Sequence, residues 1–198
     1  MVRFLRAVAV MLGLAGCSAP PPPKFPGDSS RLAAAEQLID AFYSFDSAPL
    51  RTALAAAPAS APQIVYYQGW AEGGNYAVLD RKPCRLASAD EVSCDIKVRD
   101  DLIVALGTGY WVTDTFHLTF RDGRIVKVRT SSNDPPDFEK ALDWVRTQHP
   151  DLMTGACRGF FAGGPTPQDC VRAVVKGFAD YRAAQAREVN RSSGSSFL

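Results

Sequence analysis

The segment Thr113–Val128 reads TDTFHLTFRDGRIVKV and indicates the fold more clearly than any other part of the chain. Phe116, Leu118 and Phe120 alternate with polar residues, which is the period of a strand with one buried face. Asp122-Gly123 then supplies the two residues that a tight hairpin turn prefers. The sequence therefore predicts an antiparallel hairpin, with one strand from Tyr110 to Phe120 and its partner running to about Thr130.

The residues before this hairpin also follow a period of two. We expect strands over residues 76–86 and 92–99, joined by a turn at Ala87–Glu91. Asp100 is placed to cap one helical turn that ends at Gly107. Under this interpretation, Asp100-Asp101 is a helix cap and not a metal site.

The part of the chain before the strands has helical spacing. Apolar residues three and four apart predict a helix over Arg31–Asp46, and Pro49–Ala57 suits a second, shorter one. The first helix is expected to take its N-cap from Asp28, Ser29 or Ser30. Residues 62–72 suit either a strand or a helix, and the flanking proline and glycines favour the helix.

Two further helices are expected after the hairpin. The segment Asn133–Asp137 is a helix start, and the helix runs to Gln148, where Pro150 stops it. A loop over residues 151–165 leads to a last helix that starts at Thr166. His149 complements the dipole at a helix end. Trp111 and Trp144 are expected in the core, and residues 187–198 are expected to form a disordered tail.

The first residues are typical of a secretory signal peptide. Arg3 and Arg6 precede an apolar run from Ala7 to Gly16, which is too short to span a membrane as a helix. The tetrapeptide Leu14-Ala15-Gly16-Cys17 resembles the bacterial lipobox. The resemblance implies cleavage after residue 16 and a lipid on Cys17, which would anchor the protein in the cell envelope membrane.

Residues 17–30 are expected to form a lipidated, proline-rich tether. Four consecutive prolines, Pro20–Pro23, favour an extended polyproline II conformation. The residue directly after Cys17 is Ser18 and not an aspartate. By resemblance to Gram-negative lipoproteins, this implies the outer membrane and its periplasmic face if the host is Gram-negative.

The composition limits the possible partners. The chain has 198 residues, 46% of them hydrophobic, and a formal charge of +1. Removal of Arg3 and Arg6 with the leader would change this charge to −1. Without a strongly basic face, nucleic acid is not an expected partner. The length favours one α+β domain, over residues 31–186.

The order of these elements resembles the nuclear transport factor 2-like (SnoaL-like) superfamily. The residues that carry the resemblance are the helix AAAEQLIDAFYSF and the hairpin TDTFHLTFRDGRIVKV, within Arg31–Arg129. The resemblance implies a curved antiparallel sheet wrapped around the N-terminal helices like a cone, with an additional C-terminal helix. The superfamily includes isomerases, dehydratases, transport adaptors and binding domains, so the fold does not select a function.

Four cysteines remain when Cys17 is set aside. An even number in an exported chain favours two disulfides. Cys84 and Cys94 flank a turn, and Cys157 and Cys170 bracket a loop rich in glycine and proline, so these are the expected pairs. The spacing does not fit a metal site, and neither a metal nor a cofactor is expected.

Candidate site residues come mainly from the long strand. In enzymes of the resembled fold, an Asp or His inside the cone moves a proton, which makes Asp114 and His117 the catalytic candidates. Three positions apart on a flat strand, they lie on opposite faces and cannot form a simple dyad. The pocket is expected to be lined by Tyr66, Tyr67, Trp70 and His117.

The leading hypothesis is a non-catalytic envelope lipoprotein. Its domain would bind a small apolar ligand or another envelope protein, because no GxSxG, P-loop, HExxH or GxGxxG motif is present. The alternative is an isomerase, dehydratase or hydrolase-like enzyme that uses His117 or Asp114. A third hypothesis is a structural role in which the last helix docks a partner.

Overall fold

The computed structural model describes residues 27–194. The predicted signal peptide, the lipidation site Cys17 and most of the predicted tether lie outside the described residues. The helices and strands are, in chain order, α1 (Asp28–Tyr43), α2 (Ser47–Ala53), α3 (Ala61–Gly73), β1 (Ala77–Arg81), β2 (Arg85–Leu86), β3 (Glu91–Arg99), α4 (Asp101–Leu106), β4 (Val112–Arg121), β5 (Arg124–Ser132), α5 (Pro136–Gln148), α6 (Pro150–Thr154) and α7 (Pro167–Gly194).

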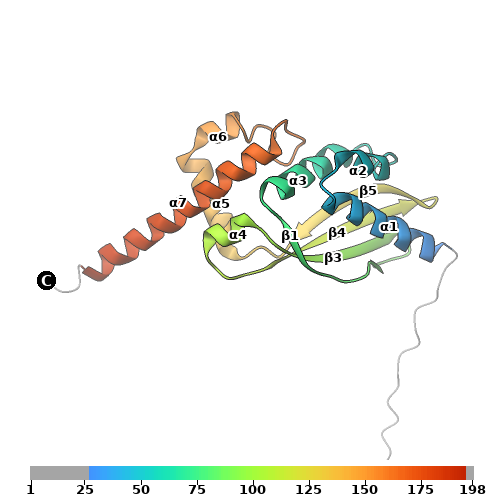
Figure 1. Cartoon of the computed structure of the whole chain (residues 1–198), viewed down its shortest axis with the longest axis horizontal. Coiled ribbons are helices and arrows are strands. Elements are labelled where there is room, and N and C mark those ends of the chain that lie inside the picture. The colour runs from blue at the N-terminus through green and yellow to red at the C-terminus, as the bar shows by residue number, and fades with distance from the viewer. Residues whose placement is uncertain (1–26, 195–198) are drawn as a thin grey trace, which may run out of the picture.

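The fold is α+β, with one five-stranded antiparallel sheet, which confirms the predicted class. The strand order is β1-β3-β4-β5, and β2 pairs with β3 beyond β1. Figure 1 shows α1, α2 and α3 over one face of the sheet, while α4–α7 gather beyond one end. Asp122 and Gly123 form the turn between β4 and β5, both with positive φ, as a two-residue hairpin requires.

The hydrophobic core lies between the sheet and α1–α3. Alternate residues of β4 are buried, and so are the apolar side chains on one face of each of these helices. The fully buried large side chains include Trp70, Phe42 and Phe116. The segment 62–72 is helical, as its flanking residues predict, and eight residues of α3 are buried.

Gln68 on α3 fixes this helix against the end of α1. Its buried amide nitrogen lies 2.9 Å from the Ala41 carbonyl oxygen, 3.0 Å from that of Phe42 and 3.2 Å from that of Asp46. The last carbonyls of a helix lack partners within the helix, so a donor from outside satisfies them. This contact sets the position of the neighbouring residue Tyr67.

The boundaries differ from the prediction in the first half of the domain. Helix α1 begins at Asp28, inside the predicted tether, and Gly27 with positive φ takes the N-cap position without a side-chain cap. Asp46 caps α2, so that helix starts earlier than predicted. The predicted strand 76–86 divides into β1 and β2, because Pro83 lies between them and cannot donate to a strand ladder.

Three expectations for the C-terminal half also need correction. The predicted loop 151–165 contains the short helix α6. Helix α7 continues through Gly194, so residues 187–194 are helical and not a disordered tail, and its end extends away from the body in Figure 1. Trp111 is 40% exposed and lies outside the core, because it precedes the paired part of β4.

Both predicted disulfides are present. Cys84 joins Cys94 across β2 and β3, and Cys157 joins Cys170 at the start of α7. The second bond ties the loop 155–166 to the end of α7 that packs on α3. Across residues 27–194, no helix combines the length and apolar character that crossing a bilayer would need.

Candidate functional site

A cavity of about 320 Å³ lies where α3, the ends of β4 and β5, α5 and the loop 155–166 meet. This volume falls in the range of small-molecule sites. The lining combines aromatic rings with several carboxyl groups, and consists of Tyr67, Trp70, Tyr76, Asp114, Thr130, Ser131, Ser132, Asp134, Phe138, Glu139, Leu142, Arg146, Phe160 and Phe161.

Asp114 is the buried charged group of this cavity. It shares the inward face of β4 with Phe116 and Leu118, and it is 2% exposed. The Tyr43 hydroxyl on α1 donates to Asp114 Oδ2 at 3.2 Å, and Tyr67 on α3 donates a second hydrogen bond. The first and third helices of the chain thus supply the donors that hold one carboxyl group.

Burial raises the pKa of Asp114 to about 7. The hydrogen bonds from Tyr67 and Tyr43 stabilise the charged form and lower the pKa, while the Asp134 and Asp100 carboxyl groups raise it. Burial also raises the pKa of Tyr67 well above its usual range. Asp114 is therefore able to hold or release a proton near neutral pH while its tyrosine partners stay protonated.

The loop 155–166 supplies one wall of the cavity. Phe160 and Phe161 pack on Trp70, with ring centroids 5.2 Å away in both cases, and Phe161 also lies 5.7 Å from Tyr67. Phe161 has a φ of 51°, a left-handed conformation that a phenylalanine adopts only when its surroundings impose it. Its ring is held against Trp70 and Tyr67, and the Cys157–Cys170 bond closes the loop that carries it.

Polar groups from the end of β5 and from α5 line the rest of the cavity. Asp134 accepts a hydrogen bond from the Ser132 hydroxyl, and burial raises its pKa. Arg146 donates to Asp143 at 2.9 Å, and its guanidinium carbon lies 5.6 Å from the centroid of the Phe160 ring. The cavity is thus aromatic, with an excess of carboxyl groups over cationic ones.

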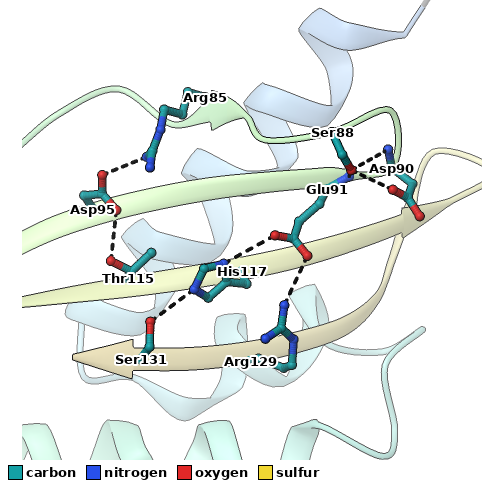
Figure 2. A network of polar contacts seen from close by, with 9 residues as sticks. All are labelled: Arg85, Ser88, Asp90, Glu91, Asp95, Thr115, His117, Arg129 and Ser131. Carbon is teal, nitrogen blue, oxygen red and sulfur yellow. Dashed lines mark hydrogen bonds and ion pairs between the residues drawn. The ribbon is translucent and has the colours of Figure 1, made fainter. Parts of the chain in front are cut away.

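His117 lies on the opposite, outer face of the sheet, so the expectation that it lines the pocket is wrong. Figure 2 shows its ring between Glu91 and Ser131, with Nδ1 3.3 Å from Glu91 Oε1 and Nε2 3.1 Å from Ser131 Oγ. Arg129 donates to the same glutamate at 3.2 Å. Strand geometry separates His117 from Asp114, as the sequence spacing indicates.

Of the three predicted wall residues, Tyr67 and Trp70 line the cavity with Asp114. Tyr66 does not, because the turn of α3 directs it to a separate hollow of about 450 Å³ beside Pro165 and Gln168. The sequence reasoning missed Tyr43, Tyr76 and the Phe160-Phe161 pair. The adjacent phenylalanines inside a cysteine-bracketed loop were the available signal, since exposed loops seldom carry two large apolar residues.

His149 lies at the C-cap of α5, as expected. Over the described ranges, no three His, Cys, Asp or Glu side chains are grouped so that they could hold a metal ion. No protein-family model matches this chain, and neither the curated proteins nor the solved structures contain a match to it. The geometry of the cavity is therefore the basis for a functional proposal.

Proposed function

We propose that this protein is an exported lipoprotein whose domain binds a small, largely apolar molecule in the cavity around Asp114. The observation that carries the proposal is the enclosure of one polar group by aromatic rings from α3 and the loop 155–166. Binding sites for small molecules commonly combine apolar walls with a few polar groups that fix orientation. Asp114 is that orienting group, held by Tyr43 and Tyr67.

The sequence supports the location that this proposal needs. A basic start, a short apolar run and the lipobox-like Leu14–Cys17 favour export and lipid attachment at Cys17. The two disulfides agree with an oxidising compartment. The protein would then be held at the envelope membrane by Cys17, with the domain free to meet ligands that diffuse through the envelope space.

We also propose membership in the nuclear transport factor 2-like superfamily with its cone-like arrangement. Three helices precede the strands and cover the sheet face that carries Asp114, which supports the proposal. Enzymes and binding domains of that superfamily use the space between helices and sheet, which corresponds in this chain to the cavity. The segment from α5 to α7 closes one end of that space.

The test of ligand binding uses the neutral fluorescent probe N-phenyl-1-naphthylamine with the full-length protein. We expect a saturable rise in probe fluorescence that Thr130→Phe abolishes, because Thr130 lines the cavity and a ring there occupies its volume. Thr119→Phe is the matched control, since Thr119 lies on the outer face of β4. Equal probe binding by both variants would reject the cavity as the site.

A second candidate function is proton transfer by Asp114. The observation that favours it is a buried carboxyl group with a pKa of about 7, which suits a general acid or base at neutral pH. The corresponding reaction is an isomerisation in which Asp114 removes a proton from one carbon of a substrate and returns it to another. His117 has no part in this candidate, because it lies outside the cavity.

The conversion of 3-cyclohexenone into its conjugated isomer tests this second function by ultraviolet absorbance. Catalysis by Asp114 predicts a rate that rises through pH 7 as the carboxyl group ionises, and loss of that rate in Asp114→Asn. If the fluorescent probe binds but the isomerisation is no faster than in buffer alone, the second function is rejected and the binding function stands.

A further inference from the structure

We infer that the ligand of the Asp114 cavity is an organic cation, an amine or quaternary ammonium group carried on apolar carbon. This inference rests on the proposed binding function and names its ligand class. It follows from three properties of the same cavity: its balance of charge, its aromatic faces and its size. The first two come from different side chains, and the third from the whole lining.

The first property is an excess of unpaired negative groups. Asp114, Asp134 and Glu139 line the cavity, and Arg146 is the one cationic side chain among the lining residues. Arg146 is already paired with Asp143, which does not line the cavity. Within residues 27–194, none of the three lining carboxyl groups forms an ion pair with an arginine or lysine.

The second property is the aromatic wall. Six rings line the cavity, from Tyr67, Trp70, Tyr76, Phe138, Phe160 and Phe161. A cation within about 6 Å of a ring centroid is attracted to the electron-rich face, and clustered rings are the usual recognition site for quaternary ammonium groups. Arg146 already lies in such a position over Phe160, so this wall accommodates positive charge.

The third property is the volume, about 320 Å³, which suits a compact ligand with one charged head. An anionic ligand would enter close to three carboxyl groups and be repelled. A neutral ligand would leave the buried Asp114 without a countercharge. A cation would supply that countercharge. The ionisable groups that interact with Asp114 carry no positive charge: they are the Tyr43, Tyr67 and Tyr76 hydroxyls and the Asp134 and Asp100 carboxyls.

Calorimetric titration of the full-length protein at pH 8 tests the inference with three probes of similar shape. They are benzyltrimethylammonium, its neutral carbon isostere neopentylbenzene, and the anion phenylacetate. We expect the cation to bind at least ~10-fold more tightly than the other two, the factor that one favourable charge pair in a partly buried site supplies. Equal or tighter binding of neopentylbenzene or phenylacetate would overturn the inference.

Substitutions show whether the carboxyl groups cause the preference. Asp114→Asn keeps the shape of the side chain and should weaken cation binding about tenfold, while leaving neopentylbenzene binding unchanged. Asp95→Asn is the control, because it removes a carboxylate from the outer face of the same sheet. If Asp114→Asn does not fold, Asp134→Asn takes its place. Cation binding that survives the loss of either lining carboxylate would also overturn the inference.

The outcomes separate this inference from the proposed function. If N-phenyl-1-naphthylamine occupies the cavity and benzyltrimethylammonium does not, the cavity is a ligand site and the cation assignment is wrong. If none of the four probes binds, the proposed binding function fails as well. Tight binding of the cation alone supports both.

Discussion

A single carboxyl group sets the chemical character of this domain. Asp114 occupies a position of β4 where its neighbours on the same face are phenylalanine and leucine. Burial disfavours the charged form, and two tyrosine hydroxyls offset only part of that cost. A residue with this environment lowers the stability of the fold at neutral pH, which is typical of a group retained for function.

The pH dependence of stability should reveal this cost. The pKa of an aspartate in the unfolded chain is about 3.9, and that of folded Asp114 is about 7. Between these values the folded protein holds a proton that the unfolded chain has released, so stability falls as the pH rises. Below pH 4 both states are protonated and the contribution is fully present.

Asp114→Asn should therefore be more stable than the wild type at pH 8 by on the order of 4 kcal/mol, and the difference should shrink as the pH falls to 4. Urea unfolding of both proteins at pH 4, 6 and 8 measures it. Asp100, whose pKa burial raises to about 6, titrates in both proteins, so its contribution largely cancels. A difference that does not change with pH would contradict the assignment.

At the scale of single residues, the sequence predicts part of this site. The alternation in TDTFHLTF places Asp114 with Phe116 on the buried face and His117 on the other. The period does not show which helices cover that face. Tyr43 and Tyr67 meet at Asp114 only because α1 and α3 cross the sheet there, and that contact is set by packing far along the chain.

At the scale of elements, one buried amide joins two helices. The Gln68 side chain donates to three carbonyl oxygens around the end of α1. Gln68→Leu keeps a similar volume but leaves those oxygens without this donor. We expect a loss of about 2 kcal/mol in the free energy of unfolding, because each buried hydrogen bond contributes about 0.5–1.5 kcal/mol. The Ala41 and Phe42 carbonyls keep other donors, Ser44 Oγ and the Phe45 N–H, so the loss comes from the missing Gln68 bonds.

Urea unfolding measures this loss, and Thr52→Ala is the control. Thr52 also bonds to a helix carbonyl, at 3.0 Å, but on an exposed surface. Its substitution should change stability by no more than about 0.5 kcal/mol. Equal effects of the two substitutions would show that Gln68 does not join the helices.

The two disulfides have different consequences for the cavity. Each closes a short loop, with sequence separations of 10 and 13, and each should contribute about 3 kcal/mol by restricting the unfolded chain. Only the Cys157–Cys170 bond holds the loop that carries Phe160 and Phe161. The sequence predicts both pairs from their spacing, but not that one of them closes a loop that lines the cavity.

Double serine substitution separates stability from cavity structure. Replacing Cys157 and Cys170 should weaken binding of N-phenyl-1-naphthylamine, because the phenylalanine wall loses its constraint. Replacing Cys84 and Cys94 should lower the melting temperature by a similar amount without changing probe affinity. The measurement is probe titration at a temperature where both variants remain folded. Equal losses of affinity would show that the loop holds its position without the bond.

The α+β class and the order of most elements follow from the sequence, since hairpin and helix signals are local. The additional helical turn α6 and the helical extension of α7 do not follow, because polar residues suit an exposed helix as well as a disordered tail. The break between β1 and β2 has a visible cause in Pro83. Such boundaries depend on pairing partners that a single sequence does not identify.

For the whole molecule, the proposed lipid anchor makes the charge and the location depend on one processing event. Cleavage before Cys17 would remove Arg3 and Arg6 and change the formal charge from +1 to −1. Acyl chains on Cys17 would then supply the membrane affinity, at about 0.8 kcal/mol for each buried CH₂ group. Every residue that lines the cavity comes at least 50 positions after Cys17 in the sequence, so the proposed anchor and the proposed ligand site belong to separate parts of the chain.

Cys17→Ala should accordingly change location without changing ligand binding. We expect the wild-type protein to have an intact mass that starts at Cys17 and includes acyl groups, and the variant to keep its leader and carry no lipid. Both should bind N-phenyl-1-naphthylamine with the same affinity, because no cavity residue precedes Tyr67 in the sequence. An unlipidated wild-type protein would reject the anchor and leave the cavity proposal intact, since the two depend on separate parts of the chain.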